Sequence, residues 1–71
     1  MSSNFLYKAK DSRDGENHWW LITGDGVIIL PWDGETKVQI LEKVKGVSFN
    51  VSHDITTFKA FAINPNLVAE W

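Results

Sequence analysis

The residues Ser48, Ser52, His53 and Asp54 carry the side-chain types of a nucleophilic catalytic triad. Three of them are consecutive in the chain, whereas a nucleophile, its base and the residue that orients the base normally converge from separate elements. We therefore expect Ser52 and Asp54 to form a turn and His53 to lie at the surface. The group does not predict catalysis.

Two pairs of carboxylates are close enough in the sequence to suggest acid–base chemistry, namely Asp25 with Asp33 and Asp14 with Glu16. Each pair lies in an apparent turn, where aspartate is expected for structural reasons. The acidic residues of the segment 11–17 lack the alternating spacing of a calcium loop. The chain has no cysteine and only two histidines. We expect no enzyme activity, no metal site and no cofactor.

Aromatic and basic side chains together suggest a second chemistry, the stacking of single-stranded nucleic acid bases on exposed rings. The candidate residues are Trp19, Trp20, Phe49 and Phe61, with Lys8, Lys10, Arg13, Lys45 and Lys59 nearby. The formal net charge of −2 argues against binding that depends on bulk positive charge. Direct nucleic acid binding is therefore an alternative and not the first hypothesis.

The N-terminal half predicts three strands that would position these side chains. Phe5, Tyr7 and Ala9 alternate with Leu6, Lys8 and Lys10, so residues 5–10 predict the first strand, and residues 11–17 are rich in turn formers. Residues 19–23 and 27–30 predict a hairpin joined through Asp25-Gly26, a sequence typical of a type I′ turn. Because proline cannot donate to a strand ladder, the third strand should end at Pro31 or lie at an edge.

The predicted turn fixes a register for this hairpin, and the register assigns side chains to faces. One face would pair Thr23 with Ile28, Leu21 with Leu30 and Trp19 with Trp32, and the other would pair Ile22 with Ile29 and Trp20 with Pro31. Both faces of the hairpin are therefore apolar.

Residues 33–46 predict a helix. Thr36 and Gln39 fit a capping box, although Asp33 could cap an earlier start, and Gly46 suits a left-handed C-terminal cap. The apolar stripe of this helix consists of Val38, Ile40, Leu41 and Val44.

The C-terminal part predicts mostly strands. Residues 47–51 alternate as a strand does. Residues 55–63 are ambiguous between helix and strand, because Ile55, Phe58 and Ala62 have helical spacing whereas the β-branched and aromatic content favours a strand. Residues 64–66 predict a turn, and residues 67–71 a short strand or extended tail. The whole chain, 1–71, is expected to form a single α+β domain: a small antiparallel sheet of four to five strands with one helix packed on it.

One helix can cover only one face of the sheet. The other face must close into a small barrel with the tryptophans inside, be covered by the C-terminal tail, or stay exposed as a partner surface. Acidic side chains border the hairpin on both sides and would steer a basic partner. The predicted partner-binding residues are Asp14, Glu16, Trp19, Trp20, Trp32, Asp33 and Glu35, with Lys8, Lys10 and Arg13 as an alternative basic patch.

The segment NFLYKAKDSRDGENHWWLITGDGVIILPWDGETKVQILEKVKG, residues 4–46, resembles small phage-encoded regulators that bind bacterial RNA polymerase. The resemblance implies a protein of the host bacterial cytoplasm that docks on the host polymerase, suppresses initiation at host promoters and promotes terminator read-through. It assigns no functional residue, because no short motif carries it. We expect a monomer without a signal peptide or membrane-spanning segment. A small phage structural or assembly protein is a further alternative.

Overall fold

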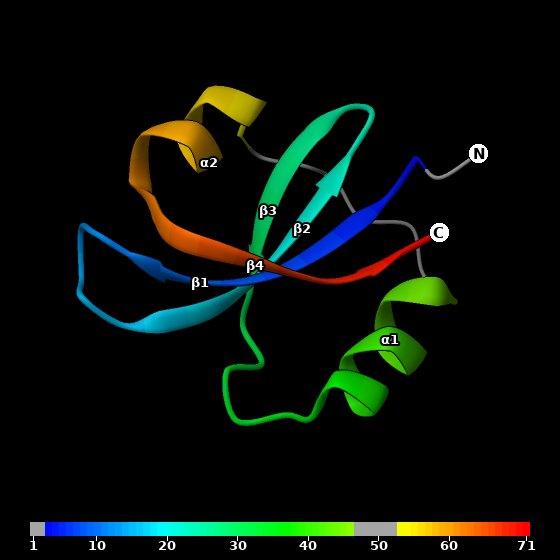
Figure 1. The fold of residues 1–71 in the computed structure, drawn as a ribbon. Helices are drawn as coiled ribbons and strands as arrows, with labels where there is room; N and C mark the ends of the chain where they lie inside the picture. The colour runs from blue at the N-terminus through cyan, green and yellow to red at the C-terminus, as the bar shows by residue number, and fades with distance from the viewer. Residues whose placement is uncertain (1–2, 47–52) are drawn as a thin grey trace.

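The computed structural model describes residues 3–46 and 53–71. The elements follow in the order β1 (Phe5–Asp11), β2 (Asn17–Thr23), β3 (Gly26–Leu30), α1 (Lys37–Lys45), α2 (Ile55–Phe61) and β4 (Ala62–Glu70). In this part of the chain the four strands form one antiparallel sheet in the order β3-β2-β1-β4, so that the last strand lies beside the first (Figure 1). The α+β class and the antiparallel sheet are confirmed, and α2 is a second helix.

The hairpin of β2 and β3 is present, but the predicted turn is wrong. Thr23 pairs with Gly26, so the two turn residues are Gly24 and Asp25. A type I′ turn needs a positive φ at both central residues, whereas of these three turn positions only Gly26 has one, at 141°. The positive φ therefore falls on the residue after the turn.

The observed register differs by two residues from the predicted one. Trp19 pairs with Leu30 and Trp20 with Ile29, not with Trp32 and Pro31. A shift of two residues leaves every side chain on its predicted face, because side chains alternate with a period of two. The strand β3 ends at Leu30 as the following proline predicts.

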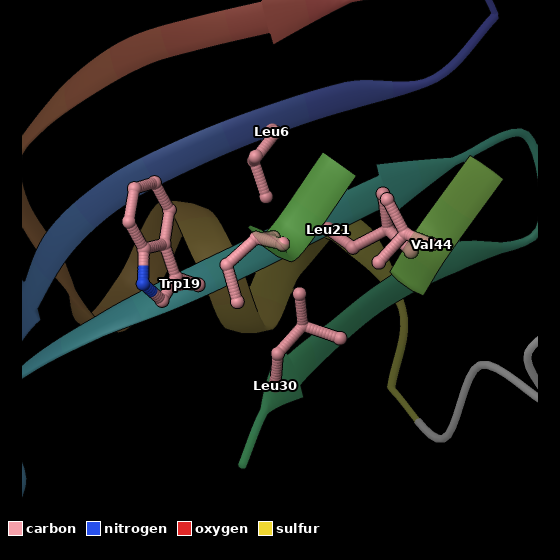
Figure 2. Packing of buried hydrophobic residues seen from close by; sticks show 6 residues of the cluster. Leu6, Trp19, Leu21, Leu30 and Val44 are labelled. Atoms are coloured by element: carbon pink, nitrogen blue, oxygen red, sulfur yellow. The ribbon is translucent and has the colours of Figure 1, made fainter. Parts of the chain in front are cut away.

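Each face of the sheet has its own hydrophobic core and its own helix. On one face Trp19 and Leu21 pack with Val44 of α1, as Figure 2 shows with Leu6 and Leu30. On the opposite face Trp20 packs against side chains of α2, including Phe58. Figure 1 shows the two helices on opposite sides of the sheet. This arrangement explains why the hairpin is apolar on both faces.

The helix α1 is shorter than the predicted range 33–46: it begins directly after Thr36 of the predicted capping box and ends before Gly46, and the conformation of its C-cap differs from the predicted one. Thr36 is the N-cap and forms a capping box with Gln39, so Asp33 is not the cap. Gly46 is the C-cap, but its φ of −97° is not left-handed, and that prediction is wrong.

The apolar stripe of α1 is narrower than predicted. Ile40 and Val44 are buried one turn apart, and Leu41 packs beside them. Val38 is 64% exposed, because it lies on the side of the helix that faces away from the sheet.

Residues 55–61 form a helix, so of the two structures left open for this segment the helix is present, against the strand that its composition favours. Asp54 accepts the Thr56 backbone N–H at 2.9 Å and caps the helix. Phe58 and Phe61 pack on the core that contains Trp20, and this burial outweighs the β propensity of the segment.

Residues 64–66 were predicted to be a turn but lie inside β4. Asn64 has a φ of 47°, and the pairing with β1 shifts register around it. Because β4 is an edge strand, it accommodates Pro65. The predicted strand 47–51 lies outside the described residues. Within the described ranges, no helix has the length and apolar character needed to cross a membrane.

Candidate partner-binding surface

His18 lies between two carboxylates that belong to different segments of the chain. Its Nε2 is 2.7 Å from Asp14 Oδ2, and its Nδ1 is 3.0 Å and 2.9 Å from the two carboxylate oxygens of Asp33. The His18 side chain is 15% exposed, whereas those of Asp14 and Asp33 are 49% and 50% exposed. The imidazole is therefore mostly covered, and the two carboxylates that flank it face solvent.

The topology explains why these residues meet. His18 precedes the Trp19–Leu30 pair of the hairpin, so the start of β2 lies beside the end of β3, and Asp33 follows shortly after that end. Asp14 lies in the β1–β2 loop, residues 12–16. Two hydrogen bonds order this loop: Gly15 donates its backbone N–H to the Asp11 carbonyl, and Glu16 donates its own to the Asp14 carboxylate at 2.8 Å.

The electrostatics of the group favour its charged state. Asp33, followed by Asp14, raises the pKa of His18 above the usual 6.5, and partial burial of the ring opposes this effect. The pKa of Asp14 is lowered from 3.8, first by the hydrogen bond from the Glu16 N–H and then by His18. Each shift stabilises the ionised form of its group.

The predicted acidic residues divide into two sets. Asp14 and Asp33 are joined through the imidazole, and the exposed Glu16 lies two residues from Asp14 and donates its backbone N–H to it. We call these three residues the acidic surface. Glu35 lies on the α1 side instead, where it forms an ion pair with Lys43 at 2.9 Å.

The predicted tryptophans belong mainly to the interior. Trp20 is fully buried and Trp19 is 7% exposed. Trp32 is partly buried against the core beneath α1, and the Lys43 ammonium lies 4.9 Å from its ring centroid. Of the predicted partner-binding residues, the charged side chains and part of Trp32 are therefore the ones accessible to solvent.

The predicted basic patch is not a single patch. Lys8 lies over the ring of Trp19 at 4.3 Å, whereas Arg13 lies over the ring of Phe61 at 4.2 Å. Trp19 and Phe61 belong to the cores on opposite faces of the sheet. Lys10 is exposed on β1 between them in sequence.

Sequence reasoning missed the role of Asp11, which it assigned to the loop. Asp11 ends β1, is 3% exposed, and binds Arg13 through contacts of 2.7–3.2 Å to both of its carboxylate oxygens. The hydrogen bond from Arg13 is the main reason why the pKa of Asp11 is lowered from 3.8. The only signal in the sequence was an aspartate two residues before an arginine, which is too common to be specific.

The residues proposed for other chemistries are used structurally or lie outside the described ranges. Asp54 caps α2, and the exposed His53 accepts the Val27 backbone N–H through its carbonyl at 2.9 Å. Ser48, Ser52 and Phe49 lie outside the described residues. Within the described ranges, no group of three or more histidine, cysteine or acidic side chains could hold a metal ion. No protein family model, curated protein or solved structure matches the chain.

Proposed function

We propose that the protein is a non-enzymatic transcription regulator that binds bacterial RNA polymerase, inhibits initiation at host promoters and promotes terminator read-through. The observation that supports binding is the acidic surface, where carboxylates from two segments converge and face solvent. The resemblance of residues 4–46 to phage-encoded regulators supports the choice of polymerase as the partner. The protein would then act in the host bacterial cytoplasm.

The chemistry of the surface favours a basic protein segment over a nucleic acid. Asp14, Glu16 and Asp33 would repel phosphates, and the formal net charge of the chain is −2. Trp19 and Trp20, the rings first considered for base stacking, are buried. Carboxylates at an exposed surface attract lysine and arginine side chains and accelerate the encounter with them. We therefore assign the contact to a lysine- or arginine-rich segment of the polymerase.

A binding experiment with purified bacterial RNA polymerase tests the proposal. Tagged protein immobilised on beads should retain the polymerase at moderate salt, and retention should weaken as salt rises because exposed charges are screened. In transcription with purified components, the protein should reduce initiation at a host promoter and increase read-through of a terminator. Failure to retain the polymerase even at low salt would overturn the proposal.

Two further measurements separate the alternative functions. Quenching of tryptophan fluorescence by single-stranded oligonucleotides, lost steeply with salt, would indicate a nucleic acid binder. Concentration-dependent association in sedimentation experiments would indicate a structural or assembly protein. The proposal expects neither result.

A further inference from the structure

His18 connects two segments that are separated in the chain. Its Nε2 contacts Asp14 of the β1–β2 loop, and its Nδ1 contacts Asp33 of the β3–α1 segment, residues 31–36. All three contacts measure 2.7–3.0 Å, which is hydrogen-bonding distance. The ring is therefore placed to hold the two segments together.

The number of protons on the ring determines how many of these bonds can form. An ionised carboxylate only accepts hydrogen bonds, so each ring nitrogen must supply an N–H to its aspartate. The imidazolium form of His18 has both N–H groups, whereas the neutral form has one. Loss of the proton leaves a nitrogen lone pair facing a carboxylate, which is repulsive.

We propose that His18 is a proton-controlled latch, which ties the β1–β2 loop to the β3–α1 segment when protonated and releases Asp14 when neutral. The retained bond is the one to Asp33, because Nδ1 lies within reach of both oxygens of that carboxylate. Asp14 has a second partner in its own loop, the Glu16 N–H at 2.8 Å, so it is satisfied without the ring.

The surrounding charges set the direction of the switch. Besides Asp14 and Asp33, the charge of Asp11 at the end of β1 interacts with His18, and Asp11 is itself paired with Arg13. Asp33 and Asp14 raise the pKa of His18, so the latch is complete below the unfolded-state pKa of about 6.5 and opens as the pH rises through the higher folded-state pKa. When His18 loses its proton, one positive charge disappears from between Asp14 and Asp33, and the net charge in the region of the acidic surface becomes more negative by one unit.

Nitrogen NMR of the histidine rings in the wild-type protein tests the latch without a partner. Comparison with His53→Gln assigns the signals of His18. Both ring nitrogens of His18 should carry protons at low pH, and only Nδ1 should carry one above the transition. A neutral ring protonated at Nε2, or equal populations of the two tautomers, would overturn the proposal.

Amide hydrogen exchange measures the release of the loop. The Gly15 N–H bonds to the Asp11 carbonyl at 2.8 Å within the β1–β2 loop, whereas the Glu35 N–H bonds to the Trp32 carbonyl at 3.1 Å in the other segment, so the rate measured at Gly15 is divided by the rate at Glu35. The ratio of their exchange rates cancels most of the intrinsic pH dependence and should rise roughly two- to fivefold across the transition. In Asp14→Asn the ratio should stay constant, because an amide can both donate to and accept from the ring. A constant ratio in the wild-type protein would contradict the latch.

Discussion

Trp19 and Trp20 are consecutive in β2, yet they lie in different hydrophobic cores on opposite faces of the sheet. The Trp20 indole donates a hydrogen bond to the Ala9 carbonyl at 3.0 Å. The Trp19 Nε1 is buried and has no acceptor among the described residues. Two adjacent tryptophans therefore both contribute apolar burial, but only Trp20 adds a hydrogen bond.

Trp20→Phe should destabilise the fold more than Trp19→Phe does. Both substitutions remove part of a buried ring, but only the first leaves the Ala9 carbonyl without its donor. The difference in the free energy of unfolding should be about 1 kcal/mol, measured by urea denaturation with circular dichroism. Equal losses for the two variants would show that the indole hydrogen bond contributes nothing.

Gly26→Ala should destabilise the hairpin, and Gly24→Ala should not. Gly26 has a φ of 141°, and a Cβ built there would lie 2.2 Å from the His53 carbonyl oxygen, whereas a Cβ at Gly24 meets no atom within 4 Å. We expect Gly26→Ala to cost at least about 1–3 kcal/mol of unfolding free energy. Thermal unfolding of the two variants checks this, and similar melting temperatures would contradict it.

The sequence allowed the faces of the sheet to be predicted, because alternation survives an error of two residues in register. Trp19 and Trp20 therefore belong to the two faces predicted for them. The turn was mispredicted because Asp25-Gly26 is a strong local signal, whereas the position of Gly26 is set by its close approach to His53, far along the chain. Local turn chemistry does not contain such a contact.

The second helix and the acidic surface were harder to predict for a related reason. The aromatic residues of 55–61 are helical because Phe58 and Phe61 pack, partly buried, against the Trp20 core, whereas propensity alone favours a strand. Asp14 and Asp33 were predicted as partner-binding residues that border the hairpin on opposite sides. Their convergence on His18 depends on the hairpin register, which the sequence did not determine correctly.

Asp11→Asn should destabilise the protein and change its response to acid. The substitution removes the charge that Arg13 contacts, and because the Arg13 side chain is 42% exposed and screened by solvent, the loss of unfolding free energy should be about 1 kcal/mol. Because the pKa of Asp11 is lowered from 3.8, its stabilisation is present above that value and is lost as the pH falls through the folded-state pKa. The free energy of unfolding, measured by denaturation at pH 7 and at pH 3, should change less between the two pH values in Asp11→Asn than in the wild type. Asp25→Asn, in the exposed turn, is the control.

Glu16→Lys should weaken retention of RNA polymerase more than Glu42→Lys does. Both residues are exposed and both substitutions change the net charge by two units, but only Glu16 belongs to the acidic surface, and Glu42 lies on α1. Because reversal of a charge at the edge of an interface mainly slows association, the rate of binding should fall about tenfold at low salt and the difference should shrink as salt rises. Surface plasmon resonance with immobilised polymerase measures both rates, and circular dichroism confirms that each variant is folded. Equal association rates for the two variants would mean that the polymerase contacts another face of the protein.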